Sequence, residues 1–279
     1  MKFCFVILHY KTFEDTIECV ESIHNLLHES QIVIVDNASN NGSIEKIEEK
    51  YKNNRDVFIV KNSDNIGFAA GNNIGYKFAR NNLNADFIAI SNNDIIVETN
   101  SFIKDICDYY LKNRFDILGP DIVSATDAGH QNPMSPKLLK KSDVSIEILR
   151  YRLLLFLSRT GIYNILKPNR KVHTGSVQKK IDMQEKRNVI LHGSFVVFSP
   201  DFVREEEIAF REGTFLYAEE VILEKYSKAK GYEMVFYPFV KVTHKEDSAT
   251  NSLGLSNKEK REFIFSNMIN SLSIYKKYF

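Results

Sequence analysis

Short apolar runs alternate with segments of helical periodicity over the first 123 residues, and this alternation leaves few folds open to the chain. The runs expected to form strands are apolar and rich in β-branched residues: 3–9, 31–35, 57–60, 87–90 and 116–123. Apolar residues recur at helical spacing in the segments between them: 13–27, 43–53, 69–82 and 101–112. Strands connected by helices predict an α/β fold with a mainly parallel central sheet and helices on both faces.

Polar residues follow three of these predicted strands. His9, Asp36 and Asp94 each stand at the end of an apolar run. Right-handed crossovers bring the carboxyl ends of parallel strands to one edge of the sheet, where ligands bind in open α/β folds. We therefore expect these three residues to gather along one rim.

The triplet Asn92-Asn93-Asp94 interrupts an apolar run that resumes at Ile95. One carboxylate with two amides at a strand end suits a hard cation that carries phosphate oxygens, because such metals take oxygen ligands and often only one or two carboxylates. The alternative is a polar turn that closes the strand.

Three glycines, Gly67, Gly71 and Gly75, are spaced by four residues. This spacing is not the G-x-G-x-x-G dinucleotide fingerprint. In a helix the three would share one face and allow close approach, either of the sheet or of phosphates beside a helix start.

Two later stretches carry further candidate groups. Glu219 and Glu220 open a helical segment, where they serve either as helix-capping acids or as a source of a general base. His244 follows the predicted strand 240–243, itself preceded by a strand at 234–237, and begins another polar loop.

Charge is distributed unevenly along the chain. The net charge is +1, but residues 137–187 hold 13 Lys and Arg against 4 Asp and Glu, which leaves 24 against 32 elsewhere. The resulting +9 segment predicts either an anionic partner or a solvated basic face. Within it, 144–157 has the pattern of a helix that lies on a membrane, or packs on the core or on a second subunit.

Other features bound the class of protein. No apolar run approaches the ~20 residues that span a bilayer, and no signal peptide is apparent. The three cysteines, Cys4, Cys19 and Cys107, form no C-x-x-C pair, which favours a reducing compartment. We expect a cytoplasmic protein, with the inner face of the membrane as a peripheral location.

Five segments in this order resemble the motifs of family 2 glycosyltransferases with the GT-A (Rossmann-like) fold, especially rhamnosyltransferase-like enzymes of bacterial surface polysaccharides. They are Val35-Asp36-Asn37-Ala38-Ser39, the glycine-rich stretch from Asn65 to Gly75, Ser91-Asn92-Asn93-Asp94, Phe215-Leu216-Tyr217-Ala218-Glu219-Glu220 and Val242-Thr243-His244. The resemblance covers nearly the whole chain except the basic segment.

The resemblance implies an inverting transfer of one sugar from a dTDP- or UDP-linked donor to a glycan or a lipid-diphosphate-linked acceptor. Asp94 and His244 would hold Mg²⁺ or Mn²⁺. The side of the site that binds the nucleotide sugar would comprise His9, Asp36, Asn65, Gly67, Gly71, Asn72, Asn92 and Asn93. The family has Glu-Asp where this chain has Glu219-Glu220, so Glu220 takes the position of the base and Glu219 is the alternative. The QxxRW signature of processive members is absent.

The same resemblance divides the chain into four parts. Residues 1–124 form the nucleotide-sugar half, 125–188 a basic and partly helical insert, 189–250 the acceptor and catalytic half, and 251–279 a C-terminal helical tail. The insert is expected to contact the acceptor or the membrane, or to form a homodimer interface.

Three rival functions remain. A non-catalytic member would bind sugar nucleotides or partner enzymes without turnover. A nucleotidyltransferase is disfavoured because the loop after the first strand, Leu8 to Thr12, lacks glycine. Nucleic acid is not expected as a partner, since no recognised binding module accompanies the basic segment.

Overall fold

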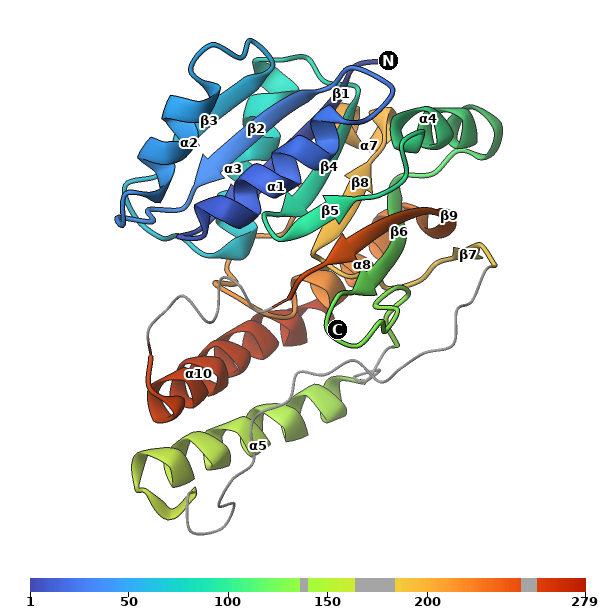
Figure 1. The fold of residues 1–279 in the computed structure, drawn as a ribbon. Helices are drawn as coiled ribbons and strands as arrows, with labels where there is room; N and C mark the ends of the chain where they lie inside the picture. The colour runs from blue at the N-terminus through green and yellow to red at the C-terminus, as the bar shows by residue number, and fades with distance from the viewer. Residues whose placement is uncertain (136–139, 164–183, 247–254) are drawn as a thin grey trace.

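The computed structural model describes residues 1–135, 140–163, 184–246 and 255–279. These residues form one nine-stranded sheet flanked by helices (Figure 1). The strands are β1 (Phe3–His9), β2 (Gln31–Asp36), β3 (Val57–Lys61), β4 (Phe87–Asn92), β5 (Ile95–Val97), β6 (Ile117–Ser124), β7 (Lys186–Arg187), β8 (Phe195–Phe198) and β9 (Met234–His244). The helices are α1 (Phe13–His24), α2 (Ser43–Tyr51), α3 (Phe68–Asn81), α4 (Phe102–Asn113), α5 (Lys141–Arg159), α7 (Pro200–Glu205), α8 (Glu219–Lys230), α10 (Asn257–Tyr275) and the 3₁₀ turn η1 (Lys276–Tyr278).

The strand order β3-β2-β1-β4-β8-β6-β9-β5 confirms the predicted α/β class. Strands β3, β2, β1 and β4 are parallel to one another, as the crossover helices require. Strand β8 then pairs antiparallel with both β4 and β6, so the parallel arrangement is interrupted beyond β4. Leu8 is in register with Asn92, and His9 with Asp36, which places the ends of β1, β2 and β4 at one rim as predicted.

Two apolar clusters hold helices against the two faces of the sheet. Phe5 and Ile7 of β1 belong to the cluster that includes α1, α2 and α4. Cys4 and Val6, whose side chains point to the opposite face, belong to the cluster with α3, α7 and α8. The continuous apolar run of β1 is thus explained by burial on both sides, which is typical of a parallel strand.

The predicted strands 234–237 and 240–243 are wrong as separate elements, because β9 runs unbroken from Met234 to His244. Pro238 lies at an irregularity where the β6 partner shifts from Tyr237 to Lys241. A proline cannot donate to a strand ladder, and a bulge accommodates it without ending the strand. Pro238, which suggests a strand break in the sequence, therefore marks a bulge within one continuous strand.

The largely apolar stretch 189–198 forms a strand only in its second half, β8. Before it, Ile190 forms an isolated bridge with Met134, and the chain turns at Gly193 and Ser194.

The C-terminal helix α10 lies between α5 and the rest of the molecule (Figure 1). A third apolar cluster joins Val144 and Ile148 of α5 to Ile222 of α8 and Leu272 of α10. The C-terminal tail therefore packs on its own domain, and so does the inner face of α5. Residues 166–183, a polar and basic part of the sequence between α5 and β7, fall outside the described residues.

None of the helices that the structure describes is long and apolar enough to cross a membrane.

Candidate active site

Asp94 is a buried carboxylate in the turn between β4 and β5. Ile95 pairs with His244 across the β5–β9 ladder, and the N–H of Lys245 donates to the carbonyl oxygen of Asp94 at 3.0 Å. These backbone contacts bring Asp94 Oδ1 to 3.3 Å from His244 Nε2. The two atoms do not have hydrogen-bond geometry, and Oδ1 has no hydrogen-bond partner among the described residues.

A neighbouring amide fixes the tautomer of His244. Its Nδ1 lies 2.8 Å from Gln131 Oε1, and Gln131 in turn donates its amide N–H to Glu246. An amide oxygen only accepts, so Nδ1 carries the proton and Nε2 presents a lone pair toward Asp94.

This pair of atoms has the chemistry of a partial metal site. A buried carboxylate oxygen without a hydrogen bond and an imidazole lone pair face the same space. Within residues 1–135, 140–163, 184–246 and 255–279, no group of three or more His, Cys, Asp or Glu side chains is arranged to hold a metal. Asp94 Oδ1 and His244 Nε2 are the atoms that could hold a cation such as Mg²⁺ or Mn²⁺, which would need further oxygen ligands from outside the protein.

Asn92 and Asn93 adjoin Asp94 but differ in their roles. The Asn93 amide donates to Thr12 Oγ1 at 2.8 Å and to Thr16 Oγ1 at 3.1 Å, which attaches the end of β4 to the start of α1. Asn92 is half-buried, and its backbone N–H donates to the Ser194 carbonyl oxygen at 2.8 Å. Asn93 thus holds the turn between β4 and β5 against α1, whereas the half-buried Asn92 lies at the end of β4, at the rim.

Asp36 occupies the equivalent position at the end of β2. Its Oδ1 accepts from the Ser39 hydroxyl at 2.5 Å and from the Ser39 backbone N–H at 3.2 Å. These bonds hold the loop that follows β2 in a tight turn around the carboxylate.

His9 is fully buried behind Asp36. Its Nδ1 lies 2.7 Å from Thr16 Oγ1 and its Nε2 lies 2.9 Å from Ser43 Oγ. Burial lowers the pKa of His9 to about 4, although Asp36 opposes this shift, so the ring is neutral at pH 7. Both ring nitrogens are engaged by the protein, which gives His9 a positioning role rather than a direct contact with a ligand.

Asn37 organises the loop before α3, a role that the sequence analysis did not assign. Its Nδ2 donates to Asn65 Oδ1 at 2.9 Å and to the Gly67 carbonyl oxygen at 3.2 Å. Asn65 Oδ1 also accepts from the Gly67 N–H at 3.0 Å. The position of Asn37 within the 35–39 motif was the available signal.

Gly67 is required where the chain enters α3. Its φ is +86°, and an added Cβ would lie 2.4 Å from the carbonyl oxygen of Phe215. That same oxygen accepts from the N–H of Phe68 at 2.7 Å, so α3 begins in direct contact with the loop that leads to Glu219.

Gly71 and Gly75 favour the packing alternative. A Cβ on Gly71 would meet Leu8 Cδ1 at 2.7 Å, and one on Gly75 would meet Val6 Cγ1 at 2.3 Å. The two glycines therefore bring α3 close to the sheet. Asn72 is buried with its Nδ2 bonded to the Phe68 carbonyl oxygen at 3.0 Å, whereas its Oδ1 has no partner among the described residues.

Glu219 and Glu220 begin α8 after two residues with left-handed backbone conformations, Tyr217 and Ala218. Glu219 is buried, and its Oε1 lacks a hydrogen-bond partner among the described residues. Burial, reinforced by the neighbouring Glu220, raises the pKa of Glu219 to about 8.

Glu220 is half-buried, and its carboxylate lies against the bend before β8. A Cβ added to Gly193 would lie 3.0 Å from Glu220 Oε1. Burial also raises the pKa of Glu220, partly opposed by nearby backbone N–H groups. Glu220 thus approaches the rim at β8, the strand that neighbours the end of β4.

His192 is a further rim residue that no motif indicated. Its ring centroid lies 5.9 Å from that of His244, and its Nδ1 accepts from the Ser194 N–H at 3.2 Å. Burial, with a smaller effect of His244, lowers the pKa of His192 to about 4. Because Nδ1 accepts, the proton of the neutral ring is on Nε2, where it can serve as a hydrogen-bond donor.

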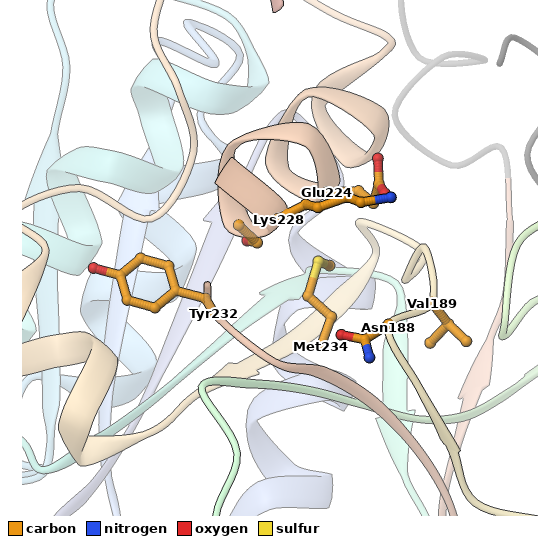
Figure 2. A pocket seen from close by; sticks show the side chains of 7 residues that line it. Asn188, Val189, Glu224, Lys228, Tyr232 and Met234 are labelled. Atoms are coloured by element: carbon orange, nitrogen blue, oxygen red, sulfur yellow. The ribbon is translucent and has the colours of Figure 1, made fainter. Parts of the chain in front are cut away.

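A small pocket of about 80 Å³ lies elsewhere, between α8 and the start of β9 (Figure 2). It is lined by Asn188, Val189, Glu224, Ser227, Lys228, Tyr232 and Met234. None of the predicted site residues contributes to it, so the pocket is separate from the candidate site.

Comparison with known proteins agrees with this arrangement. The sequence model of Glycosyl transferase family 2 matches residues 4–174. No curated protein sequence matches the chain.

Among solved structures, similar folds include S. aureus TarS residues 1–349 in complex with UDP-GlcNAc, at 16% identity and a TM-score of 0.56, covering 99% of this chain and 66% of that one. GalNAc-T7 with UDP, GalNAc and Mn²⁺ is 14% identical with a TM-score of 0.59, covering 89% and 45%. The mannosyltransferase PcManGT from Pyrobaculum calidifontis with GDP-Man and Mn²⁺ is 12% identical with a TM-score of 0.56, covering 90% and 59%.

The chain spans less than two thirds of the length of each of these three proteins. At these identities the likeness establishes the fold, which is GT-A. The family match extends over more than half of the sequence. The chain therefore belongs to glycosyltransferase family 2.

Proposed function

We propose that this protein transfers a single sugar from a nucleoside-diphosphate sugar to an acceptor hydroxyl, with inversion at the anomeric carbon. The observation that carries the proposal is the position of Asp94 Oδ1, a buried carboxylate oxygen that lies 3.3 Å from His244 Nε2 and has no hydrogen-bond partner in the described part of the chain. TarS, GalNAc-T7 and PcManGT were each solved with a nucleotide or a sugar nucleotide. A dTDP- or UDP-linked hexose or rhamnose is the proposed donor.

Asp94 and His244 would hold Mg²⁺ or Mn²⁺, and the cation would stabilise the negative charge of the leaving diphosphate. Two of the similar structures contain Mn²⁺. The neutral His192 ring, which lies beside His244, would donate a hydrogen bond from Nε2 to the bound diphosphate. Asp36, Asn65, Gly67, Asn72 and Asn92 would line the nucleotide side of the site, with His9, Gly71 and Asn93 holding it in shape.

Glu220 is the proposed base. Glu220 is half-buried as a residue and its Oε1 would lie 3.0 Å from a Cβ added to Gly193, whereas Glu219 is buried. A carboxylate with a raised pKa accepts the acceptor's hydroxyl proton more readily as the oxygen attacks the anomeric carbon from the face opposite the diphosphate. In this scheme residues 1–124 bind the donor and residues 189–250 supply the base and the acceptor side.

The proposed acceptor is a glycan or a lipid-diphosphate-linked saccharide of bacterial surface polysaccharide synthesis. A non-catalytic protein that binds sugar nucleotides is the second candidate, favoured by the substitution of Glu-Asp by Glu219-Glu220.

Thermal stabilisation by UDP, dTDP, GDP and CMP, each with and without Mn²⁺, tests donor binding. A ligand that binds only the folded state raises its stability by mass action. We expect one nucleoside diphosphate to raise the melting temperature, and to need Mn²⁺ to do so. A failure of all four to shift it would contradict the proposal.

A further inference from the structure

The outer face of α5 exposes four large apolar side chains. Ile146, Leu149, Leu153 and Phe156 are 64%, 68%, 56% and 60% exposed. Their spacing of three and four residues places them in one stripe along the helix. We call these four residues the α5 stripe.

Packing among the described residues does not account for the α5 stripe. The opposite face of α5 already buries Val144 and Ile148 against α10 and α8. The helix is therefore apolar on two faces, and only the inner one is covered by the described residues. A contiguous apolar surface of this kind marks an interaction site.

Arginines border the α5 stripe on both sides. At about 100° per residue, Arg150 lies roughly 40° beyond Ile146, and Arg152 lies roughly 40° beyond Phe156 on the other side. Both side chains are exposed, as is Arg159 at the end of the helix. Arg150 is paired with Glu147 at 2.8 Å, and the surrounding sequence, residues 137–187, has a net charge of +9.

We propose that the α5 stripe is a docking surface for an anionic membrane. Leucine, isoleucine and phenylalanine side chains can enter the boundary between headgroups and acyl chains. Arginines on either side can extend along the apolar surface and keep their guanidinium groups at the lipid phosphates. The helix would then lie flat in the interface with α10 behind it.

The charge distribution favours a membrane over a second copy of the chain. A twofold interface built on the stripe would bring the same arginine-bordered surface of each copy together. The two acids of α5 are already engaged, Glu147 with Arg150 and Asp143 with the N–H of Lys140. Such an interface would concentrate like charge, whereas anionic lipid headgroups would neutralise it.

Docking through α5 would bring the membrane to the side of the molecule that holds the candidate base. Helix α10, which carries α5, donates a hydrogen bond from Ser271 Oγ to the Leu216 carbonyl oxygen at 2.8 Å. Leu216 lies in the loop that enters α8 at Glu219. This orientation suits a lipid-linked acceptor, a consequence that rests on the proposed function, whereas membrane binding itself does not.

Co-sedimentation of the full chain with vesicles tests the surface. Phosphatidylcholine vesicles with and without 30% phosphatidylglycerol would be compared, using wild type, L149S/L153S and the charge-reversal variant R150E/R152E. The matched control is L27S/L111S, because Leu27 and Leu111 are 70% and 60% exposed on other elements. All four substituted leucines are exposed, so the variants should melt at the wild-type temperature.

We expect wild type and L27S/L111S to bind the anionic vesicles, and both α5 variants to bind at least tenfold more weakly. We also expect 0.5 M NaCl to weaken wild-type binding. Equal binding by wild type and the α5 variants, or no binding by wild type, would overturn the proposal. It would also be overturned by a wild-type dimer in analytical ultracentrifugation that L149S/L153S dissociates and that does not bind vesicles.

Nucleotide stabilisation of L149S/L153S separates this proposal from the proposed function. The variant should keep the wild-type shift with nucleoside diphosphate and Mn²⁺. Loss of vesicle binding in L149S/L153S with the nucleotide shift retained supports the surface. Vesicle binding that wild type shows and L149S/L153S loses, with no nucleotide shift in either protein, would count against the sugar-transfer function alone.

Discussion

At the scale of single residues, the two adjacent glutamates of α8 differ in their surroundings. Glu219 is buried, with one carboxylate oxygen that has no hydrogen-bond partner among the residues the structure describes, and Glu220 is half-buried beside Gly193. Burial raises the pKa of both groups, to about 8 for Glu219. Two glutamates that are adjacent in sequence therefore have different surroundings, which is why we propose different roles for them.

The raised pKa of Glu219 predicts a pH dependence of stability. The unfolded carboxyl ionises near 4.5 and the folded one near 8, so the unfolded state releases its proton first as the pH rises. Stability should therefore fall between pH 4.5 and 8, by about 1.4 kcal/mol for each pH unit at most. Glu219→Gln should match wild type near pH 4 and exceed its free energy of unfolding by roughly 2–4 kcal/mol at pH 8.

Urea unfolding at several pH values measures this difference. Glu212→Gln is the control, since Glu212 is exposed in the preceding loop. A Glu219→Gln difference that stayed constant from pH 4 to 8 would show that Glu219 does not have a raised pKa.

The assignment of the base predicts unequal losses of activity. Glu220→Gln keeps the size of the side chain but cannot accept a proton, and should lower the rate of sugar transfer by about 10²–10⁴-fold. Glu219→Gln should lower it by less than about tenfold. Release of nucleoside diphosphate from the donor identified by thermal stabilisation measures both rates, and the reverse order would assign the base to Glu219.

Which residues lie at the rim of the sheet could be predicted from the sequence only in part. The ends of β1, β2 and β4 follow from strand–helix alternation, so the placement of His9, Asp36 and Asp94 at one edge was predicted correctly. The burial of His9 was not predictable, because it depends on Thr16 and Ser43 from two different helices. His192 had no motif, and only the bend before β8 places it beside His244.

At the scale of elements, long-range pairing was the main feature that local periodicity did not encode. The insertion of β8 between β4 and β6 depends on contacts between Ile90 and Val196, which are distant in sequence. The break predicted at Pro238 is a bulge because β6 pairs with β9 on both sides of it. Short-range features such as α3 and α8, by contrast, follow directly from apolar spacing and terminal residues.

Gly67 couples two elements of the site, and its substitution should separate them. Gly67→Ala would place a Cβ 2.4 Å from the Phe215 carbonyl oxygen, at a φ of +86°. Gly231→Ala is the control for a positive φ, because Gly231 has a φ of +80° with nothing within 4 Å of its added Cβ. Its ψ of 15° differs from the −177° of Gly67, so the extra loss at Gly67 includes a backbone contribution as well as the contact with Phe215. We expect the control to lose about 1–2 kcal/mol of stability from the backbone conformation alone, and Gly67→Ala to lose at least about 2 kcal/mol more.

Chemical denaturation of both variants measures the difference. Equal losses would show that the loop at Phe215 moves away without cost, and that the contact with α3 does not position Glu219 and Glu220.

The hydrogen bond from α10 to the loop at Leu216 should affect catalysis more than a comparable bond within α10. Ser271 Oγ donates to Leu216, whereas Ser273 Oγ donates to Ile269 of its own helix at 2.6 Å. Ser271→Ala should cost about 0.5–1.5 kcal/mol of stability and slow sugar transfer severalfold, because the loop holds the base. Ser273→Ala should leave the transfer rate within twofold of wild type, and equal rates for the two variants would contradict a positioning role for α10.

At the scale of the whole molecule, the predicted sheet, its flanking helices and the two helices α5 and α10 are arranged in layers. The sheet and its helices form the GT-A body, and α10 and α5 add a further layer on the side of the loop that leads to Glu219 (Figure 1). The sequence predicted a basic helix between the two halves, but only the structure separates its packed inner face from the exposed α5 stripe. The candidate site lies between chain segments that are distant in sequence, and the approach of Asp94 to His244 depends on the pairing of β5 with β9.

The most direct test of this account is the dependence of nucleotide binding on Asp94. Thermal unfolding would be measured with the best nucleoside diphosphate, with and without Mn²⁺, for wild type, Asp94→Asn and the control Asp64→Asn, whose carboxylate is exposed. We expect Asp94→Asn to fold and to lose the Mn²⁺-dependent part of the shift, while Asp64→Asn keeps it. A full Mn²⁺-dependent shift in Asp94→Asn would place the cation elsewhere and contradict the site described here.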